Sequence, residues 1–308
     1  MEPAQPIALK SWISAMRLRT LPLSFSAILA GSAMVHPSTE QYTEIVLMAL
    51  CTTFLLQVLS NFANDLGDYK NGADSEDRIG PKRAVQSGVI SPEAMMRATL
   101  AFGALSLISG ILLLFIAFPW ATYSLHLLVF LGIGTLAILA AYHYTAGRNP
   151  YGYKGLGDVS VFFFFGIAGV AGTAFLLQKE SEFYFLLPAA AIGSFATAVL
   201  NLNNMRDVVN DAKTGKITLV VRLGAKAARK YHTLLFLVGW LSLFFYGIIS
   251  DRSIHYYLVF LWLPVHAAHL RRVFTTAQPQ DLDPELKKIA LSTFGISLTI
   301  FLVNLVWN

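Results

Sequence analysis

Nine long apolar runs divide the chain into segments with the composition of membrane-spanning helices. A helix needs about 20 mainly apolar residues to cross a bilayer, and these runs carry few or no charges. The first run is short, and it reaches that length only if it extends backward through Trp12–Met16, which brings Arg17 and Arg19 near the interface. The pattern predicts an all-α bundle of nine transmembrane helices. They lie at residues 21–35, 45–64, 98–118, 122–144, 156–177, 183–204, 231–249, 254–270 and 289–307.

The distribution of basic residues predicts how this bundle is oriented. If the N-terminus lies inside, the segments on the inner side hold 21 of the 23 Lys and Arg residues. Only Lys179 and Arg252 fall in the outer loops. Cytoplasmic loops carry the excess of positive charge in membrane proteins, and a wrong number of spans would scramble the alternation. We therefore expect a cytoplasmic N-terminus and a C-terminus on the outer side.

The overall composition points to membrane lipid as the surrounding solvent. The chain is 55% hydrophobic and 13% charged, whereas a soluble domain carries about 25% charged residues. The net charge of +5 follows from the membrane topology, so it predicts no nucleic-acid partner. Because no linker or low-complexity tract interrupts the runs, we expect residues 1–308 to form a single membrane domain.

Two acidic clusters stand where stability alone would not place them. Asp65 and Asp68 follow the second predicted span, and Asp207 and Asp211 follow the sixth. If the helices continue through these residues, each pair lies on one helical face, where like charges repel. Both pairs also lie at helix C-terminal ends, where the helix dipole is already negative. A bound Mg²⁺ would reverse both penalties, since carboxylate oxygens are the ligands that it prefers.

Basic and amide side chains surround both clusters. A single acidic pair could equally be a solvated loop whose acids balance nearby Lys and Arg, but two pairs at membrane depth favour a functional site. Carboxylates, Mg²⁺ and cations together bind a diphosphate, and no Gly-rich phosphate-binding loop of the Walker type occurs. The candidate metal ligands are Asp65, Asp68, Asp207 and Asp211, with Asn64 and Asn204. The candidate substrate-binding residues are Asn64, Lys70, Arg78, Lys82, Arg83, Lys154, Asn204, Arg206 and Lys216.

These motifs resemble those of the UbiA-type superfamily of intramembrane aromatic prenyltransferases, which are typically nine-helix bundles with two Asp-rich motifs. The likeness is greatest to its branch that prenylates 1,4-dihydroxy-2-naphthoate. Beyond the two acidic motifs, the tracts 77–91 and 144–158 are similar to that branch, and 144–158 is the most branch-specific. One departure from the general superfamily pattern is Gly72, which stands where a third Asp is usual. The next acid is Asp74, and whether it binds metal stays open.

The resemblance implies a Mg²⁺-dependent transfer of a polyprenyl group from polyprenyl diphosphate to 1,4-dihydroxy-2-naphthoate. CO2 and diphosphate would leave, and the product would be a demethylmenaquinone of menaquinone biosynthesis, made in a bacterial inner membrane at its cytoplasmic face. Tyr144 is the catalytic aromatic candidate beside the four Asp residues, because aromatic faces stabilise cations.

Three alternative functions remain. A sister prenyltransferase would use 4-hydroxybenzoate or another ring. A CDP-alcohol phosphotransferase would place its acids in one motif, whereas here about 140 residues separate two. A cation transporter would place them near the middle of broken helices.

Two further groups have more than one interpretation. Asp158 lies in the fifth apolar run, where it either pairs with Lys154 or belongs to the site. The seven histidines accompany no metal-binding motif, although His266 and His269 share a helical face. We interpret them as hydrogen-bonded structural residues.

Overall fold

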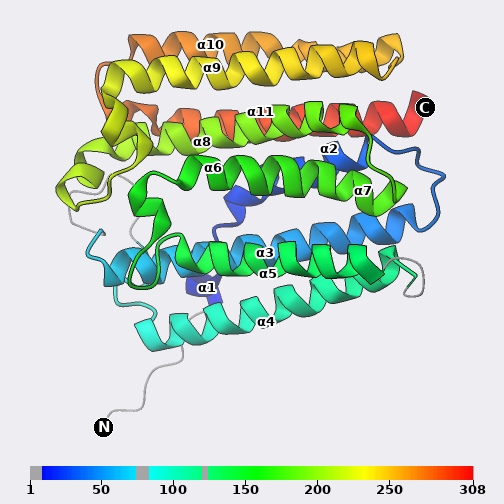
Figure 1. The fold of residues 1–308 in the computed structure, drawn as a ribbon. Coiled ribbons are helices and arrows are strands. Elements are labelled where there is room, and N and C mark those ends of the chain that lie inside the picture. The colour runs from blue at the N-terminus through cyan, green and yellow to red at the C-terminus, as the bar shows by residue number, and fades with distance from the viewer. Residues whose placement is uncertain (1–8, 74–82, 120–123, 308) are drawn as a thin grey trace.

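All regular structure in the described part of the chain is helical. The computed structural model describes residues 9–73, 83–119 and 124–307 (Figure 1). The helices are α1 (Leu9–Met16), α2 (Leu21–Ser32), α3 (Tyr42–Lys70), α4 (Pro92–Ala117), α5 (Ser124–His143), α6 (Gly157–Val161), α7 (Gly172–Gln178), α8 (Leu186–Lys213), α9 (Leu219–Ile249), α10 (Leu263–Thr275) and α11 (Asp283–Trp307). A π-helix, η3 (Phe162–Ala171), joins α6 to α7. Short 3₁₀ turns are η1 (Leu18–Thr20), η2 (Tyr151–Lys154), η4 (Phe183–Phe185), η5 (Ile254–Trp262) and η6 (Pro279–Leu282).

Seven of the described helices are long and apolar enough to cross a membrane, so the chain is an integral membrane protein. They correspond to seven of the nine predicted spans. The other two predicted spans, 21–35 and 254–270, fall on the 12-residue helix α2 and on η5 followed by α10. The count of nine spans and the orientation of the termini therefore stay predictions.

The first predicted span does not extend backward as a continuous helix. Arg17 adopts a left-handed backbone conformation, with φ of 49°, and it separates α1 from η1 and α2. The side-chain amide of Asn61 on α3 fixes this break: Nδ2 donates to the carbonyl of Met16 at 2.8 Å and to the hydroxyl of Thr20 at 3.2 Å. The backward extension through Trp12–Met16 that the sequence allowed is therefore not a continuous helix, because a side chain from another helix binds the carbonyl at the break.

The helices pack in two groups with a seam between them. Helix α5 packs on α3 and α4, whereas α6, η3 and α7 pack mainly on α2 and α8, and α9 and α11 lie against α8. In Figure 1 the C-terminal ends of α3 and α8, which carry the acidic motifs, lie at the left end of the bundle, and α11 ends at the right. The fold thus gathers the two motifs at one end of the seam.

A buried polar chain links α8, α9, α10 and α11. His232 contacts the side chain of Asn201 at 3.1 Å and His269 at 2.8 Å, and His269 contacts Glu285 at 2.8 Å. Lys288 then donates to Glu285 at 2.6 Å. Such buried groups are stabilising only when they are hydrogen-bonded. For His232 and His269 the interpretation as hydrogen-bonded structural residues is confirmed.

Close packing of α2 on η3 depends on Gly31. A Cβ atom at Gly31 would overlap the carbonyl oxygen of Val170 and would lie 2.8 Å from Cβ of Thr173. We expect Gly31→Ala to lower the free energy of unfolding by about 1–3 kcal/mol, as overpacking does. Gly132→Ala on α5 is the control, since a Cβ there meets no atom within 4 Å. Thermal unfolding in detergent measures both, and equal melting temperatures would contradict the prediction.

Candidate active site

The first acidic motif occupies the last turns of α3. The helix continues to Lys70, which confirms that Asp65 and Asp68 lie three residues apart on one helix. Both side chains are buried, at 1% and 3% exposure. Between them, Gly67 presses on the backbone of the loop after α5, where an added Cβ would lie 2.6 Å from the amide nitrogen of Ala146. The motif is therefore held against a rigid neighbour.

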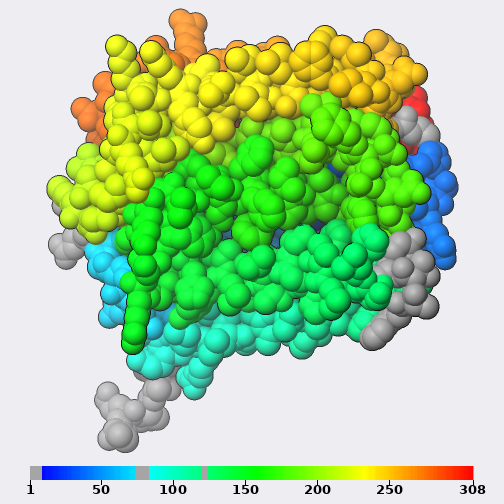
Figure 2. All heavy atoms as spheres, viewed as in Figure 1, coloured from blue at the N-terminus to red at the C-terminus, as the bar shows by residue number. Residues whose placement is uncertain are grey.

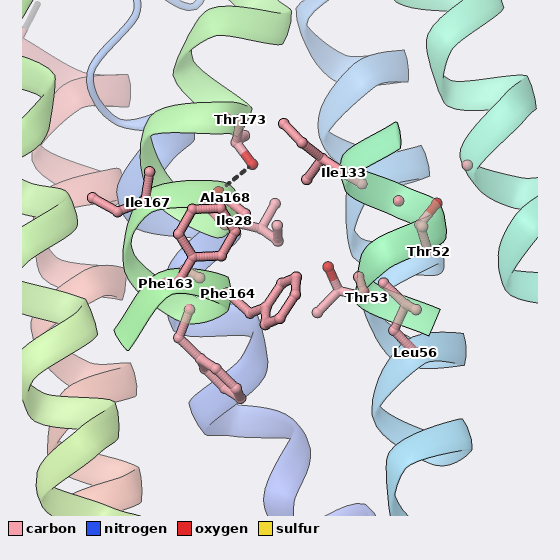
Figure 3. A pocket seen from close by; sticks show the side chains of 18 of the residues that line it. Ile28, Thr52, Thr53, Leu56, Ile133, Phe163, Phe164, Ile167, Ala168 and Thr173 are labelled. Atoms are coloured by element: carbon pink, nitrogen blue, oxygen red, sulfur yellow. Dashed lines mark hydrogen bonds between the residues drawn. The ribbon is translucent and has the colours of Figure 1, made fainter. Parts of the chain in front are cut away.

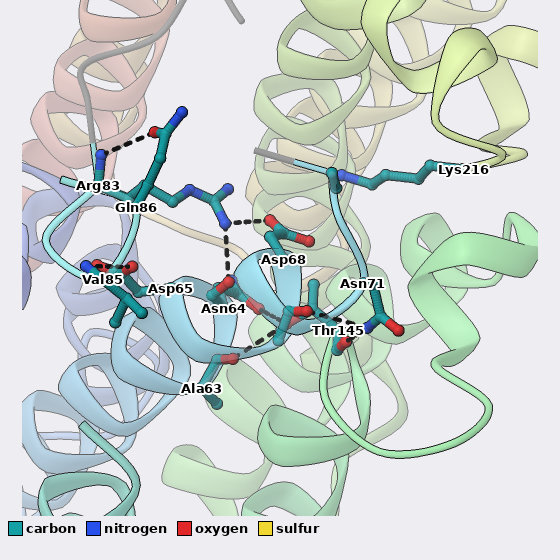
Figure 4. Close-up of polar contacts among 12 residues, drawn as sticks. Ala63, Asn64, Asp65, Asp68, Asn71, Arg83, Val85, Gln86, Thr145 and Lys216 are labelled. Carbon is teal, nitrogen blue, oxygen red and sulfur yellow. Dashed lines mark hydrogen bonds and ion pairs between the residues drawn. The ribbon is translucent and has the colours of Figure 1, made fainter. Parts of the chain in front are cut away.

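The two acids of this motif have different partners (Figure 4). Asp65 accepts hydrogen bonds from the backbone amides of Ala84 at 3.1 Å and Val85 at 3.3 Å. Asp68 forms an ion pair with Arg83 and accepts a hydrogen bond from the hydroxyl of Tyr153 at 2.7 Å. Asp65 therefore holds the segment that follows the motif, while Asp68 is surrounded by groups that bind anions.

The second acidic motif lies on the last turns of α8. That helix continues to Lys213, so Asp207 and Asp211 lie four residues apart on it, as predicted. Arg206 donates to both carboxylate oxygens of Asp207, at 2.8 and 2.6 Å, and to Asp283 at 2.6 Å. Arg206 thus links α8 to the start of α11. Its partners in the structure are these two carboxylates, whereas the sequence predicted that it binds substrate.

Asp211 is less completely paired than the other three acids. Its Oδ1 lies 3.7 Å from the ammonium of Lys216. Its Oδ2 is buried and has no hydrogen-bond partner among the described residues. A buried carboxylate oxygen without a donor is costly, so a ligand that completes it would be bound favourably.

Lys216 connects the two motifs. Its ammonium lies 5.6 Å from the ring centroid of Tyr153, which binds Asp68, and its charge acts on both Asp68 and Asp211. A hydrogen bond also joins α8 to the segment after α3: Nδ2 of Asn210 donates to the backbone carbonyl of Ala73 at 3.1 Å. The structure therefore brings acids from α3 and α8 together around a shared cation.

The remaining predicted residues are placed as follows. Asn64 accepts a hydrogen bond from Thr145 at 3.0 Å, and Asn204 is buried on α8. Lys70 and Lys154 are exposed. Arg78, Lys82 and Asp74 lie outside the described residues.

Sequence reasoning did not single out Tyr153 or Thr145, because neither carries a charge. Both fall within the tract 144–158, and its likeness to the naphthoate branch was the available signal.

A mainly apolar cavity of about 920 Å³ fills the seam. At one end it is lined by Asn64 and Tyr144, and at the other by Glu182 and Phe183. Along α3 it runs from Ala49 to Asn64, which is roughly 22 Å at the helical rise. Figure 2 shows the face of the molecule hollowed between α5 and the segment α6–η3–α7. The cavity has the length and lining to hold a long apolar chain.

The π-helix shapes one wall of this cavity. Phe163, Phe164 and Phe165 all line it, and Figure 3 shows Phe164 projecting from η3 toward α3 and α5. On the same wall the hydroxyl of Thr173 donates to the carbonyl of Gly169 at 2.6 Å. π-helical turns are rare and are frequent at functional sites, and here the turn places aromatic side chains along the seam.

Tyr144 stands where the cavity meets the acidic motifs. Its ring lies edge-on to that of Tyr151, with centroids 5.4 Å apart. A phenol keeps its proton at neutral pH. Tyr144 is therefore a neutral aromatic face and a hydrogen-bond donor rather than a base.

The donor set fits a Mg²⁺ ion that is shared with a phosphate. Within the described residues, no three His, Cys, Asp or Glu side chains converge as a complete metal cage. Mg²⁺ is usually held by one or two carboxylates together with water and substrate phosphates. Asp68 and Asp211, with the orphaned Oδ2 of Asp211, supply such a pair.

Comparison with known proteins identifies the family. The profile of the UbiA prenyltransferase family matches residues 22–294. The chain is 42% identical to the 1,4-dihydroxy-2-naphthoate octaprenyltransferase of Haemophilus influenzae, over 94% of each chain. It is 41% identical to the enzyme of the same name from Escherichia coli, over 91% of this chain and 90% of that one. The chain belongs to the UbiA prenyltransferase family, which confirms the resemblance seen in its motifs.

Solved structures show the same fold. A UbiA homolog from Aeropyrum pernix superposes with a TM-score of 0.68 at 16% identity, over 94% of this chain and 99% of that one. A UbiA homolog from Archaeoglobus fulgidus bound to DMAPP and Mg²⁺ gives a TM-score of 0.64 at 16% identity, over 95% and 99%. At this identity the likeness carries the fold alone.

Proposed function

We propose that this protein transfers a polyprenyl group from polyprenyl diphosphate to 1,4-dihydroxy-2-naphthoate, with loss of CO2 and diphosphate, in menaquinone biosynthesis. The product is a demethylmenaquinol. The observation that carries the proposal is the meeting of two acidic motifs and their cations at one end of a long apolar cavity. The names of relatives about 40% identical over nearly the whole chain support the naphthoate as the ring.

The diphosphate binds between α3 and α8 in this proposal. Arg83 and Lys216 provide positive charge beside Asp68 and Asp211, which hold Mg²⁺. Asp65 and Asp207 complete the metal site, because a carboxylate oxygen that accepts one hydrogen bond retains a second lone pair. Mg²⁺, when bound, neutralises the charge that develops on the leaving diphosphate. The protein cations act in the same direction, and their contacts strengthen as the bond breaks.

The proposed transfer needs no external base, because CO2 leaves the ring carbon in place of a proton. The bond between the first prenyl carbon and the diphosphate oxygen breaks, and its electron pair leaves with diphosphate. The ring carbon that bears the carboxylate then bonds to the allylic carbon. Its bond to the carboxylate breaks, CO2 departs, and that electron pair restores the aromatic ring. Tyr144 faces the place where the allylic cation forms and stabilises it through its ring quadrupole.

The lipid bilayer determines how the apolar substrate enters and on which side the acidic end lies. The apolar prenyl tail lies in the cavity of the seam, and it enters from lipid through the hollow between α5 and η3. Nine spans with a cytoplasmic N-terminus place the acidic end at the cytoplasmic face of a bacterial inner membrane, where soluble naphthoate arrives.

A competition assay tests the proposed reaction. The detergent-purified protein receives a polyprenyl diphosphate, Mg²⁺, 1,4-dihydroxy-2-naphthoate and 4-hydroxybenzoate together, and product masses are measured. We expect a prenylated naphthoquinol that has lost CO2, and no product in EDTA because the diphosphate is then not neutralised. A prenylated benzoate would overturn the ring assignment, and turnover in EDTA would overturn the role of Mg²⁺.

Neutral replacements of the shared acids test the metal site. We expect Asp68→Asn and Asp211→Asn to lower kcat at least about 100-fold, as loss of a charge-stabilising group does. Asp251→Asn is the matched control, because Asp251 is exposed and its φ of 47° is one that Asn adopts readily. Circular dichroism and thermal unfolding verify the fold. Near-parental turnover of either site variant would contradict the assignment.

A larger residue in the cavity wall tests where the tail lies. Ala168 on η3 lines the cavity. We expect Ala168→Phe to lower kcat/KM for long polyprenyl diphosphates more than for a short one, because the added ring occupies tail volume. Leu128→Phe on the exposed face of α5 is the control. Equal effects of Ala168→Phe on long and short substrates would place the tail elsewhere.

A further inference from the structure

Asp158 is a buried carboxylate without a basic partner among the described residues. It is the second residue of α6, and only 5% of it is exposed. It forms no ion pair with any Lys or Arg in the described ranges, and Lys154, its expected partner, is exposed. The pairing interpretation of Asp158 is therefore wrong. A buried charge is normally paired, and one without a partner at membrane depth is a candidate for function.

The surroundings of Asp158 relate it to Tyr144. Tyr231 on α9 is a polar neighbour of its carboxylate, while Oδ1 is buried and has no hydrogen-bond partner in the described chain. The hydroxyl of Tyr144 lies against the preceding residue, Gly157, where an added Cβ would be 2.7 Å away. Asp158 therefore lies close enough for its charge to act on the hydroxyl of Tyr144.

Two glycines keep the ring of Tyr144 in this place. A Cβ at Gly157 or at Gly152 would lie 3.2 Å from Tyr144 ring carbons, so only glycine allows the ring to sit so close to both backbones. The ring of Tyr151 also packs against it, nearly perpendicular and with centroids 5.4 Å apart. Tyr144 is thus held between the start of α6 and the cavity that it lines, with Gly157, the residue before Asp158, against its hydroxyl.

We propose that Asp158 is a positioning residue that acts through Tyr144: its buried negative charge makes the Tyr144 ring a stronger stabiliser of the allylic cation. This inference rests on the proposed function, because it requires an allylic diphosphate in the cavity. The carboxylate does not touch the substrate.

The physical basis is electrostatic preorganisation. A negative charge near the hydroxyl of Tyr144 repels the ring electrons away from the hydroxyl, toward the ring carbons, and it adds its own attraction for a cation at the ring. The low dielectric of the buried site keeps this effect large. Because the charge is fixed before the reaction, it stabilises the transition state without any rearrangement. The two acidic motifs and their cations bind the leaving diphosphate anion. Asp158 and Tyr144 act instead on the allylic cation.

A double-mutant cycle tests the inference. We expect Asp158→Asn to lower kcat about 10- to 100-fold with little change in KM for either substrate, since it removes charge and retains size. In a Tyr144→Leu background, which lacks the ring, we expect the same replacement to lower kcat less than about threefold. Equal losses in both backgrounds would overturn the proposal, and so would a raised KM with unchanged kcat.

Two further variants separate charge from structure. Tyr231→Phe removes a polar neighbour on α9 but leaves the charge of Asp158, so we expect kcat within about threefold of the parent. A loss as large as that of Asp158→Asn would show that Asp158 only braces α6 against α9. Asp251→Asn again controls for an exposed Asp. All rates use whichever ring the parent protein prenylates, so a wrong naphthoate assignment is seen in the parent and not in these ratios.

Discussion

Charge buried at the end of an apolar bundle is the constraint on which this structure depends. Four carboxylates lie on the last turns of two long helices, where each neighbouring acid and each helix dipole disfavours them. Arg83, Arg206 and Lys216 offset part of this cost by pairing with Asp68, Asp207 and Asp211. Since Oδ2 of Asp211 has no donor in the described chain, the site remains incomplete without a ligand.

The same pairing organises the surrounding chain. Asp65 holds the backbone of Ala84 and Val85, and Arg206 reaches Asp283 at the start of α11. The acids therefore position the segments around the site as well as contributing to its charge. Removing one of them would leave its partner buried and unpaired, so the function and the local structure of these residues are linked.

The cavity is a second environment, and it is apolar where the acidic end is charged. It is mainly apolar and aromatic, and Asn64 and Tyr144 line it at the acidic end. Dissociation of an allylic diphosphate separates an anion from a cation, and the two ends of this site suit one each. Asp158 forms no ion pair with a Lys or Arg of the described chain, and it follows Gly157, which packs against Tyr144. The role proposed for its charge is to favour the cation at this end of the site.

Periodicity and residue type by themselves determined the apolar helices, the two acidic pairs at helix ends and the family motifs, because these depend on neighbours three or four residues apart. The break at Arg17 depends on Asn61, which lies 44 residues away in the chain. Tertiary structure alone decided the partners of Asp65 and Asp158, the role of Tyr153 and the wall formed by η3. Each of these depends on which side chains from distant helices meet, and a linear pattern of apolar and polar residues does not record that.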